Sequence, residues 1–129
     1  MSTTFTPVFE SKVPPYGTLG SDHPDLNRAQ QRLDRLAVAG GLTPLSAFES
    51  YAPDEVEEFV DAPPGGHPPA QWFPPAVGLA AVEALRAHLT ANPNTISQQA
   101  GVLEDLAEVA DELRAAEQVG VRFRFAVIM

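Results

Sequence analysis

Thirteen prolines restrict where this chain of 129 residues can form regular structure. Proline holds φ near about −65° and has no amide hydrogen, so it suits the first turn of a helix and disrupts a helix interior. Pro24, Pro44, Pro53 and Pro75 each open a segment whose apolar residues are spaced as in a helix, and each predicts the start of a helix. The segment 62–75 contains six prolines and two glycines, a composition that predicts a connector without regular structure.

Apolar residues recur at helical spacing in five segments. We expect helices at 24–39, 44–49, 53–61, 75–91 and 95–119. The glycine pair 40–41 can form the left-handed end of the first helix, and Asn92-Pro93 ends the fourth. At the start of the fifth helix, Thr95 and Gln98 predict a capping box, in which two side chains satisfy free amides of the first turn.

Alternating side chains predict a strand at 121–129, with Phe123 and Phe125 on one face. A single strand needs a partner, because an isolated strand leaves its backbone groups unpaired. The β-branched and aromatic residues of 3–10 predict that partner. Pro7 cannot donate a backbone hydrogen bond, which places the N-terminal strand at the edge of the sheet.

Residues 11–23 contain Pro14-Pro15 and two glycines, so we expect a loop there. Together these elements predict a single α+β domain over residues 1–129, with the connector inside it. The domain is expected to be mainly helical, with about five helices packed on a small sheet that includes the C-terminal strand.

The charge balance excludes several classes of partner. The chain has 17 acidic and 8 basic side chains and a formal net charge of −9. Each contact with a phosphate needs a lysine or arginine, so neither nucleic acid nor an anionic membrane is an expected partner. The absence of cysteine excludes disulfides and thiolate metal sites. No signal peptide and no long apolar segment are visible, so we expect a cytoplasmic protein.

Histidines and hydroxyl residues show no catalytic or metal-binding pattern. His23, His67 and His88 have no histidine or cysteine partner at helical spacing, and the only acid–histidine cluster is 22–25. At that cluster we expect helix capping rather than a metal site. The sequence also lacks a nucleophile elbow and a phosphate-binding glycine loop. We therefore expect no metal, no cofactor and no catalytic residue, and a binding domain rather than an enzyme.

Acidic residues gather in two places. Residues 49–61 contain six carboxylates and no basic side chain. In the expected helix 95–119, Glu104, Glu108 and Glu112 stand four residues apart, where like charges destabilise a helix by about 0.2–0.5 kcal/mol per pair. Two interpretations are open: a solvated face that keeps the protein soluble, or a surface prepared for a basic partner.

Trp72-Phe73 stands at the end of the connector. Aromatic residues just before a helix cap the hydrophobic core more often than they anchor an interface, so a core role is expected first and an interface role second. Arg122 and Arg124 lie on the polar side of the last strand. We expect them to pair with acids of the sheet or of the long helix.

Several packing and capping residues resemble a group of small bacterial proteins of unknown function, over roughly half of the chain. The resemblance is carried by Gly41-Leu42-Thr43-Pro44-Leu45, Phe48, Trp72-Phe73, Gly78-Leu79, Val82, Ala84-Leu85, His88-Leu89, Ala91-Asn92-Pro93, Val102-Leu103-Glu104-Asp105-Leu106 and Gly120-Val121-Arg122-Phe123. It implies a stand-alone bacterial domain. It brings no activity and no catalytic residue with it.

The leading hypothesis is a non-enzymatic protein-binding domain, of the immunity, inhibitor or adaptor type, whose acidic face covers a basic partner protein. The residues expected to contact that partner are Glu55, Glu57, Glu58, Asp61, Trp72, Glu104, Glu108 and Glu112.

Two alternatives belong to other classes. One is a small-molecule-binding or enzymatic domain with a pocket between the sheet and the connector 62–75, using Trp72, His67 or Tyr16. The other is a homodimer joined through the long helix or through the terminal strands.

Overall fold

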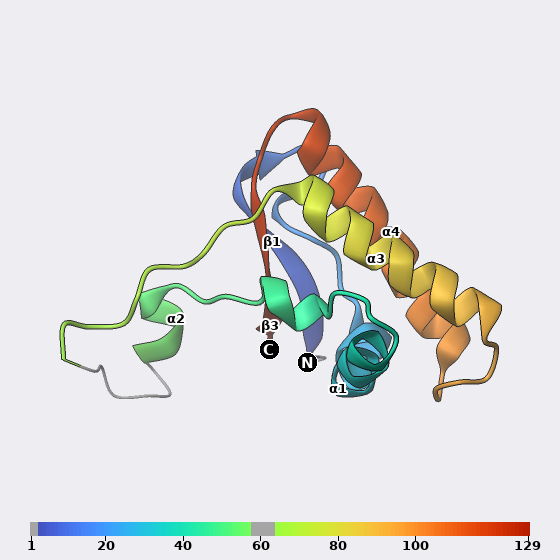
Figure 1. The fold of residues 1–129 in the computed structure, drawn as a ribbon. Helices are drawn as coiled ribbons and strands as arrows, with labels where there is room; N and C mark the ends of the chain where they lie inside the picture. The colour runs from blue at the N-terminus through green and yellow to red at the C-terminus, as the bar shows by residue number, and fades with distance from the viewer. Residues whose placement is uncertain (1–2, 58–63) are drawn as a thin grey trace.

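The computed structural model describes residues 3–57 and 64–129, and Figure 1 shows their arrangement. In chain order the elements are β1 (Thr4–Val13), β2 (Gly17–Leu19), α1 (Pro24–Ala39), the 3₁₀ helix η1 (Leu45–Phe48), α2 (Pro53–Glu57), α3 (Pro75–Ala91), α4 (Gln99–Gln118) and β3 (Phe123–Ile128). The α+β class is confirmed. Within the described ranges there are four α-helices and one short 3₁₀ turn, where the sequence predicts about five helices.

β1 is the central strand of a three-stranded antiparallel sheet, in the order β2-β1-β3. The predicted pairing of the two terminal segments is confirmed, because Thr4 pairs with Ile128 and Phe9 with Phe123. The prediction that the N-terminal strand lies at an edge is wrong. The prediction of a loop throughout 11–23 is also wrong, because β1 runs into this segment and β2 lies inside it.

Pro7 is tolerated in a central strand because its nitrogen faces the side where β2 has already ended. The Pro7 carbonyl accepts a hydrogen bond of 2.9 Å from the amide of Gly20, the residue just beyond β2. The nitrogen and the carbonyl of one strand residue point to the same edge, so the ring nitrogen of Pro7 also faces Gly20. Pairing with β3 on the other edge therefore needs no amide from Pro7.

Two of the helices predicted from proline positions are confirmed with their bounds, α1 at 24–39 and α3 at 75–91. The segment 44–49 forms a 3₁₀ turn instead of an α-helix. The predicted helix 53–61 is confirmed as far as Glu57, and its remainder lies outside the described residues.

α4 begins at Gln99, four residues later than predicted, and the expected capping box does not form. Gln98 has a φ of 57°, in the left-handed region that an α-helix cannot contain. The side chain of Gln99 fastens the preceding turn instead: its oxygen accepts hydrogen bonds from the amides of Thr95 at 2.8 Å and Ile96 at 3.2 Å.

An aromatic cluster forms the centre of the core. The ring centroids of Phe5 and Phe125 lie 4.9 Å apart, and Phe123 contacts Phe48 of η1 at 5.7 Å. Phe73 and Phe123 also exchange two backbone hydrogen bonds, of 2.8 and 3.0 Å. This bridge ties the end of the connector to the outer edge of β3, and it confirms the core role expected for Phe73.

Helices α3 and α4 lie side by side along one side of the sheet, whereas α2 stands on the opposite side (Figure 1). α3 approaches the sheet closely at Gly78. A Cβ atom at this position would lie 2.2 Å from Cζ of Phe123, so the ring occupies the space that a side chain would need.

We predict that Gly78→Ala lowers the free energy of unfolding by about 1–3 kcal/mol, because the added methyl group displaces the Phe123 ring. Alanine normally stabilises a helix interior relative to glycine by about 0.5–1 kcal/mol, so the sign itself is informative. Urea unfolding followed by circular dichroism measures the effect. The matched control is Ala80→Gly on the exposed side of α3, which should lower stability by about 0.5–1 kcal/mol. Unchanged or greater stability of the Gly78→Ala variant would contradict the close packing.

Candidate functional site

The acidic residues of α4 divide between two faces of the helix. Glu104 and Glu108 are exposed, as expected for a charged surface. Glu112 is only 1% exposed, so its prediction as a surface residue that contacts a partner is wrong. A helix turns by about 100° per residue, which places Glu112 about 80° away from Glu104 and only about 20° away from Asp105. Glu112 therefore shares the buried face with Asp105, which is 8% exposed.

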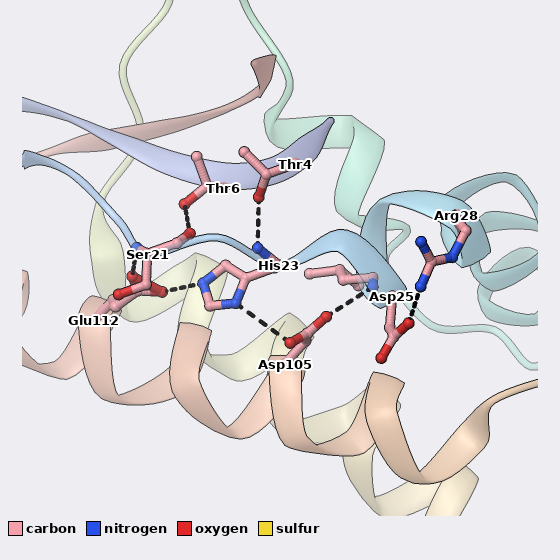
Figure 2. Close-up of polar contacts among 9 residues, drawn as sticks. Thr4, Thr6, Ser21, His23, Asp25, Arg28, Asp105 and Glu112 are labelled. Atoms are coloured by element: carbon pink, nitrogen blue, oxygen red, sulfur yellow. Dashed lines mark hydrogen bonds and ion pairs between the residues drawn. The ribbon is translucent and has the colours of Figure 1, made fainter. Parts of the chain in front are cut away.

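His23 lies between these two buried carboxylates and is fully buried (Figure 2). Its Nε2 atom is 2.6 Å from Oε1 of Glu112. Its Nδ1 atom is 3.6 Å from Oδ1 of Asp105, which is an ion-pair distance but too long for a hydrogen bond. One imidazole from the start of α1 thus bridges two acids that lie two turns apart on α4.

Each carboxylate also accepts a hydrogen bond from the backbone near His23. Oε2 of Glu112 accepts from the amide of Ser21 at 2.6 Å, and Oδ2 of Asp105 accepts from the amide of Leu26 at 2.9 Å. Leu26 is in the first turn of α1, whose capping residue is His23. The His23 side chain makes no capping hydrogen bond, so the capping role expected for the 22–25 cluster is supplied from α4 by Asp105.

β1 holds the same segment from the other side. The amide of His23 donates to Oγ1 of Thr4 at 2.6 Å, and the hydroxyl of Thr6 donates to the carbonyl of Ser21 at 2.9 Å. Gly20 is needed here, because a Cβ atom would lie 2.4 Å from Oε2 of Glu112. The segment 20–26 is therefore hydrogen-bonded to β1 on one side and α4 on the other, as Figure 2 shows.

The surroundings of His23 favour its charged form. Burial lowers the pKa of the imidazole, whereas its hydrogen bond to Glu112 and the negative charges of Glu112, Asp105 and Glu108 raise it. The net effect raises the pKa above its ordinary value. The folded protein consequently binds this proton more tightly than the unfolded chain. The associated stabilisation is complete below the unfolded pKa of about 6.5 and is lost as the pH rises through the folded pKa.

In the acidic segment 49–61, the carboxylate of Glu55 is already bound within the chain and is therefore less available to a partner protein than the composition suggests. Oε1 of Glu55 binds the guanidinium of Arg124 at 2.7 Å and accepts a hydrogen bond from the amide of Ala52 at 2.6 Å. The side chain of Glu57, and the whole of Glu58 and Asp61, lie outside the described residues.

Arg124 also connects Trp72 to this group. The guanidinium lies 5.2 Å from the centre of the half-buried Trp72 ring. The prediction for Arg122 is confirmed, because it binds Glu10 of β1 at 2.5 Å. Arg124 pairs with Glu55 of α2 instead of an acid of the sheet or of α4.

The surface hollows of the described structure include two on different sides of the sheet. One, of about 520 Å³, lies between α1 and the turn before α4 and includes Arg28, Arg32 and Thr95 in its lining. The other, of about 680 Å³, lies beside α2 and the end of β3 and includes Tyr51 and Val127. Neither is lined by Trp72, His67 or Tyr16, the residues expected for a small-molecule pocket.

Among residues 3–57 and 64–129, no group of three histidine or acidic side chains could hold a metal ion. In the same part of the chain, no helix is both long enough and apolar enough to cross a membrane. No protein-family model, curated protein sequence or solved structure matches this chain. Its function is therefore inferred from its own geometry.

The cluster of His23, Asp105 and Glu112 was missed because its members lie far apart in the sequence. One signal was present: Asp105 and Glu112 each stand three residues after one core residue and four before another, in the row Val102, Val109 and Ala116. Two acids in phase with a row of core residues on one helix indicate acids that face inward and need a partner.

We predict that Glu112→Ala destabilises the protein by about 3–5 kcal/mol, because it leaves the buried imidazole of His23 and the amide of Ser21 without their acceptor. Glu104→Ala on the exposed face of the same helix is the matched control, and its effect should stay within about 0.5 kcal/mol. Urea unfolding of the two variants measures the difference. Equal effects at the two positions would show that the buried cluster does not stabilise the fold.

Proposed function

We propose that this chain is a non-catalytic protein-binding domain that engages a basic partner through the exposed carboxylates of α4. The observation that carries the proposal is that the carboxylates of Glu104 and Glu108 are exposed and unpaired within the described structure. Both are exposed, they stand one helical turn apart, and they make no hydrogen bond or ion pair with the described residues. Their mutual repulsion destabilises the free protein slightly, and a cationic partner would relieve it.

The chain's own basic residues do not neutralise this face. Five of the eight basic side chains are already paired with acids of the same chain: Arg28, Arg86, Arg114, Arg122 and Arg124. Arg114, the basic residue of α4, binds Asp111 at 3.0 Å and Glu83 of α3 at 2.6 Å. The basic residues are thus occupied elsewhere, and the net charge of −9 favours a cationic partner surface and speeds its association.

An aromatic side chain borders the acidic face. Burial, followed by the negative charges of Glu112, Asp111 and Glu108, raises the pKa of Tyr16. Tyr16 lies in the turn between β1 and β2 and is half-buried. A tyrosine beside carboxylates offers both apolar contact and a hydroxyl group, a combination that is enriched in protein interfaces. These features favour the immunity, inhibitor or adaptor type of domain, in which a small protein covers a basic surface of another.

The test is capture of the partner by the immobilised chain from an extract of its source organism. At low salt we expect one basic protein to be retained in stoichiometric amount, and at about 0.5 M salt we expect it to be lost, because salt screens exposed charges. Mass spectrometry identifies the protein. Its association rate should then fall several-fold for the double variant Glu104→Gln/Glu108→Gln, with a weaker dependence on salt.

The control is Asp22→Asn/Asp54→Asn, which removes the same two charges from exposed positions outside α4. This control should retain most of the association rate. Equal losses for the two double variants would mean that only net charge matters and would overturn the assignment to α4. Retention of no protein at either salt concentration would overturn the proposed function itself.

A further inference from the structure

The two nitrogens of His23 face the carboxylates of Glu112 and Asp105. Nε2 is 2.6 Å from Oε1 of Glu112, and Nδ1 is 3.6 Å from Oδ1 of Asp105. A neutral imidazole carries one N–H and one lone pair, whereas a protonated imidazole carries two N–H groups. The protonation state of His23 therefore decides whether both contacts are attractive.

Either neutral form leaves one repulsive contact. With the proton on Nε2, the hydrogen bond to Glu112 survives and the lone pair of Nδ1 faces the carboxylate of Asp105. With the proton on Nδ1, the lone pair of Nε2 faces Oε1 of Glu112 at 2.6 Å. Rotation cannot relieve this repulsion, because the ring is fully buried and the amide of His23 is held by Thr4.

We propose that the proton on His23 is a latch: the imidazolium holds the segment 20–26 against α4, and loss of that proton releases the segment and the first turn of α1. The release is local to the segment 20–26. The same two carboxylates accept hydrogen bonds from the backbone amides of Ser21 and Leu26, so these residues are released together with His23. Those amides lose their acceptors when α4 and the segment separate. The latch stands on this geometry alone and does not depend on the proposed partner.

The groups that face His23 come from each element packed against it. α4 presents the carboxylates of Asp105, Glu108 and Glu112, all of which favour the charged imidazole. β1 presents only the hydroxyls of Thr4 and Thr6 to this segment. Because burial is outweighed by these negative charges, the latch is closed at and below the ordinary pKa of histidine, about 6.5, and opens as the pH rises further.

The test follows two signals in the chain of 129 residues by NMR between about pH 6 and pH 9.5. The ring nitrogens report the protonation of His23. Amide exchange at Ser21 and Leu26, normalised for the intrinsic effect of pH, reports the latch. We expect His23 to titrate above its ordinary value and protection at both amides to fall at least tenfold through the same midpoint.

The variant Asp105→Asn tests the effect of the negative charge on His23 while the hydrogen bond to Leu26 is kept. Asparagine retains an oxygen that can accept from the amide of Leu26, but it carries no charge. We expect the shared midpoint to move to lower pH in this variant. Glu117→Gln, an equal change of charge on the exposed surface of α4, should leave the midpoint in place. In the His23→Gln variant, which cannot titrate here, amide protection should no longer depend on pH in this range.

Three results would overturn the latch. The first is titration of His23 at or below its ordinary value. The second is constant protection at Ser21 and Leu26 while His23 loses its proton. The third is an unchanged midpoint in the Asp105→Asn variant, which would show that Asp105 does not act on the imidazole.

Discussion

The hydrogen bond between His23 and Glu112 is the contact on which the N-terminal part of this fold depends. It joins the segment that leaves the sheet to the longest helix, with no solvent around either side chain. Ser21 and Leu26 are bound by the same two carboxylates, so α1 receives its missing cap from α4 rather than from its own neighbours. Removal of either acid would leave buried donors without acceptors, a costly state in a protein interior.

α4 uses carboxylates for two opposite purposes. On the inner face, Asp105 and Glu112 are each matched by a backbone amide and share one imidazole, so their burial is compensated. On the outer face, Glu104 and Glu108 are exposed and make no hydrogen bond or ion pair with the described residues. A count of charges in the sequence does not distinguish the two buried acids from the two exposed ones. The rotation of the helix, about 100° per residue, separates the two roles.

Local signals in the sequence were sufficient to predict a helix or strand where a single residue type or a simple alternation fixes the backbone conformation. Pro24 and Pro75 gave the starts of α1 and α3, and the alternation beyond Gly120 gave β3. Features that depend on distant partners were not predictable in this way. Pro7 occupies a central strand only because β2 ends opposite it, and the role of His23 depends on acids that lie 82 and 89 residues further along the chain. No window of neighbouring residues contains that information.

The long sequence separation within this cluster has a consequence for how the protein is made. The N-terminal strand pairs with β3, and α1 is capped by a residue of α4, so both early elements are completed by the last third of the chain. During synthesis the first 26 residues emerge with a histidine that lacks both of its carboxylates, with uncapped helix amides and with a strand whose edge toward β3 is unpaired. They can reach their final state only after α4 and β3 have left the ribosome. Folding of the early elements is thereby tied to the synthesis of α4 and β3, and a product cut off before them would expose β1 as an open edge for association.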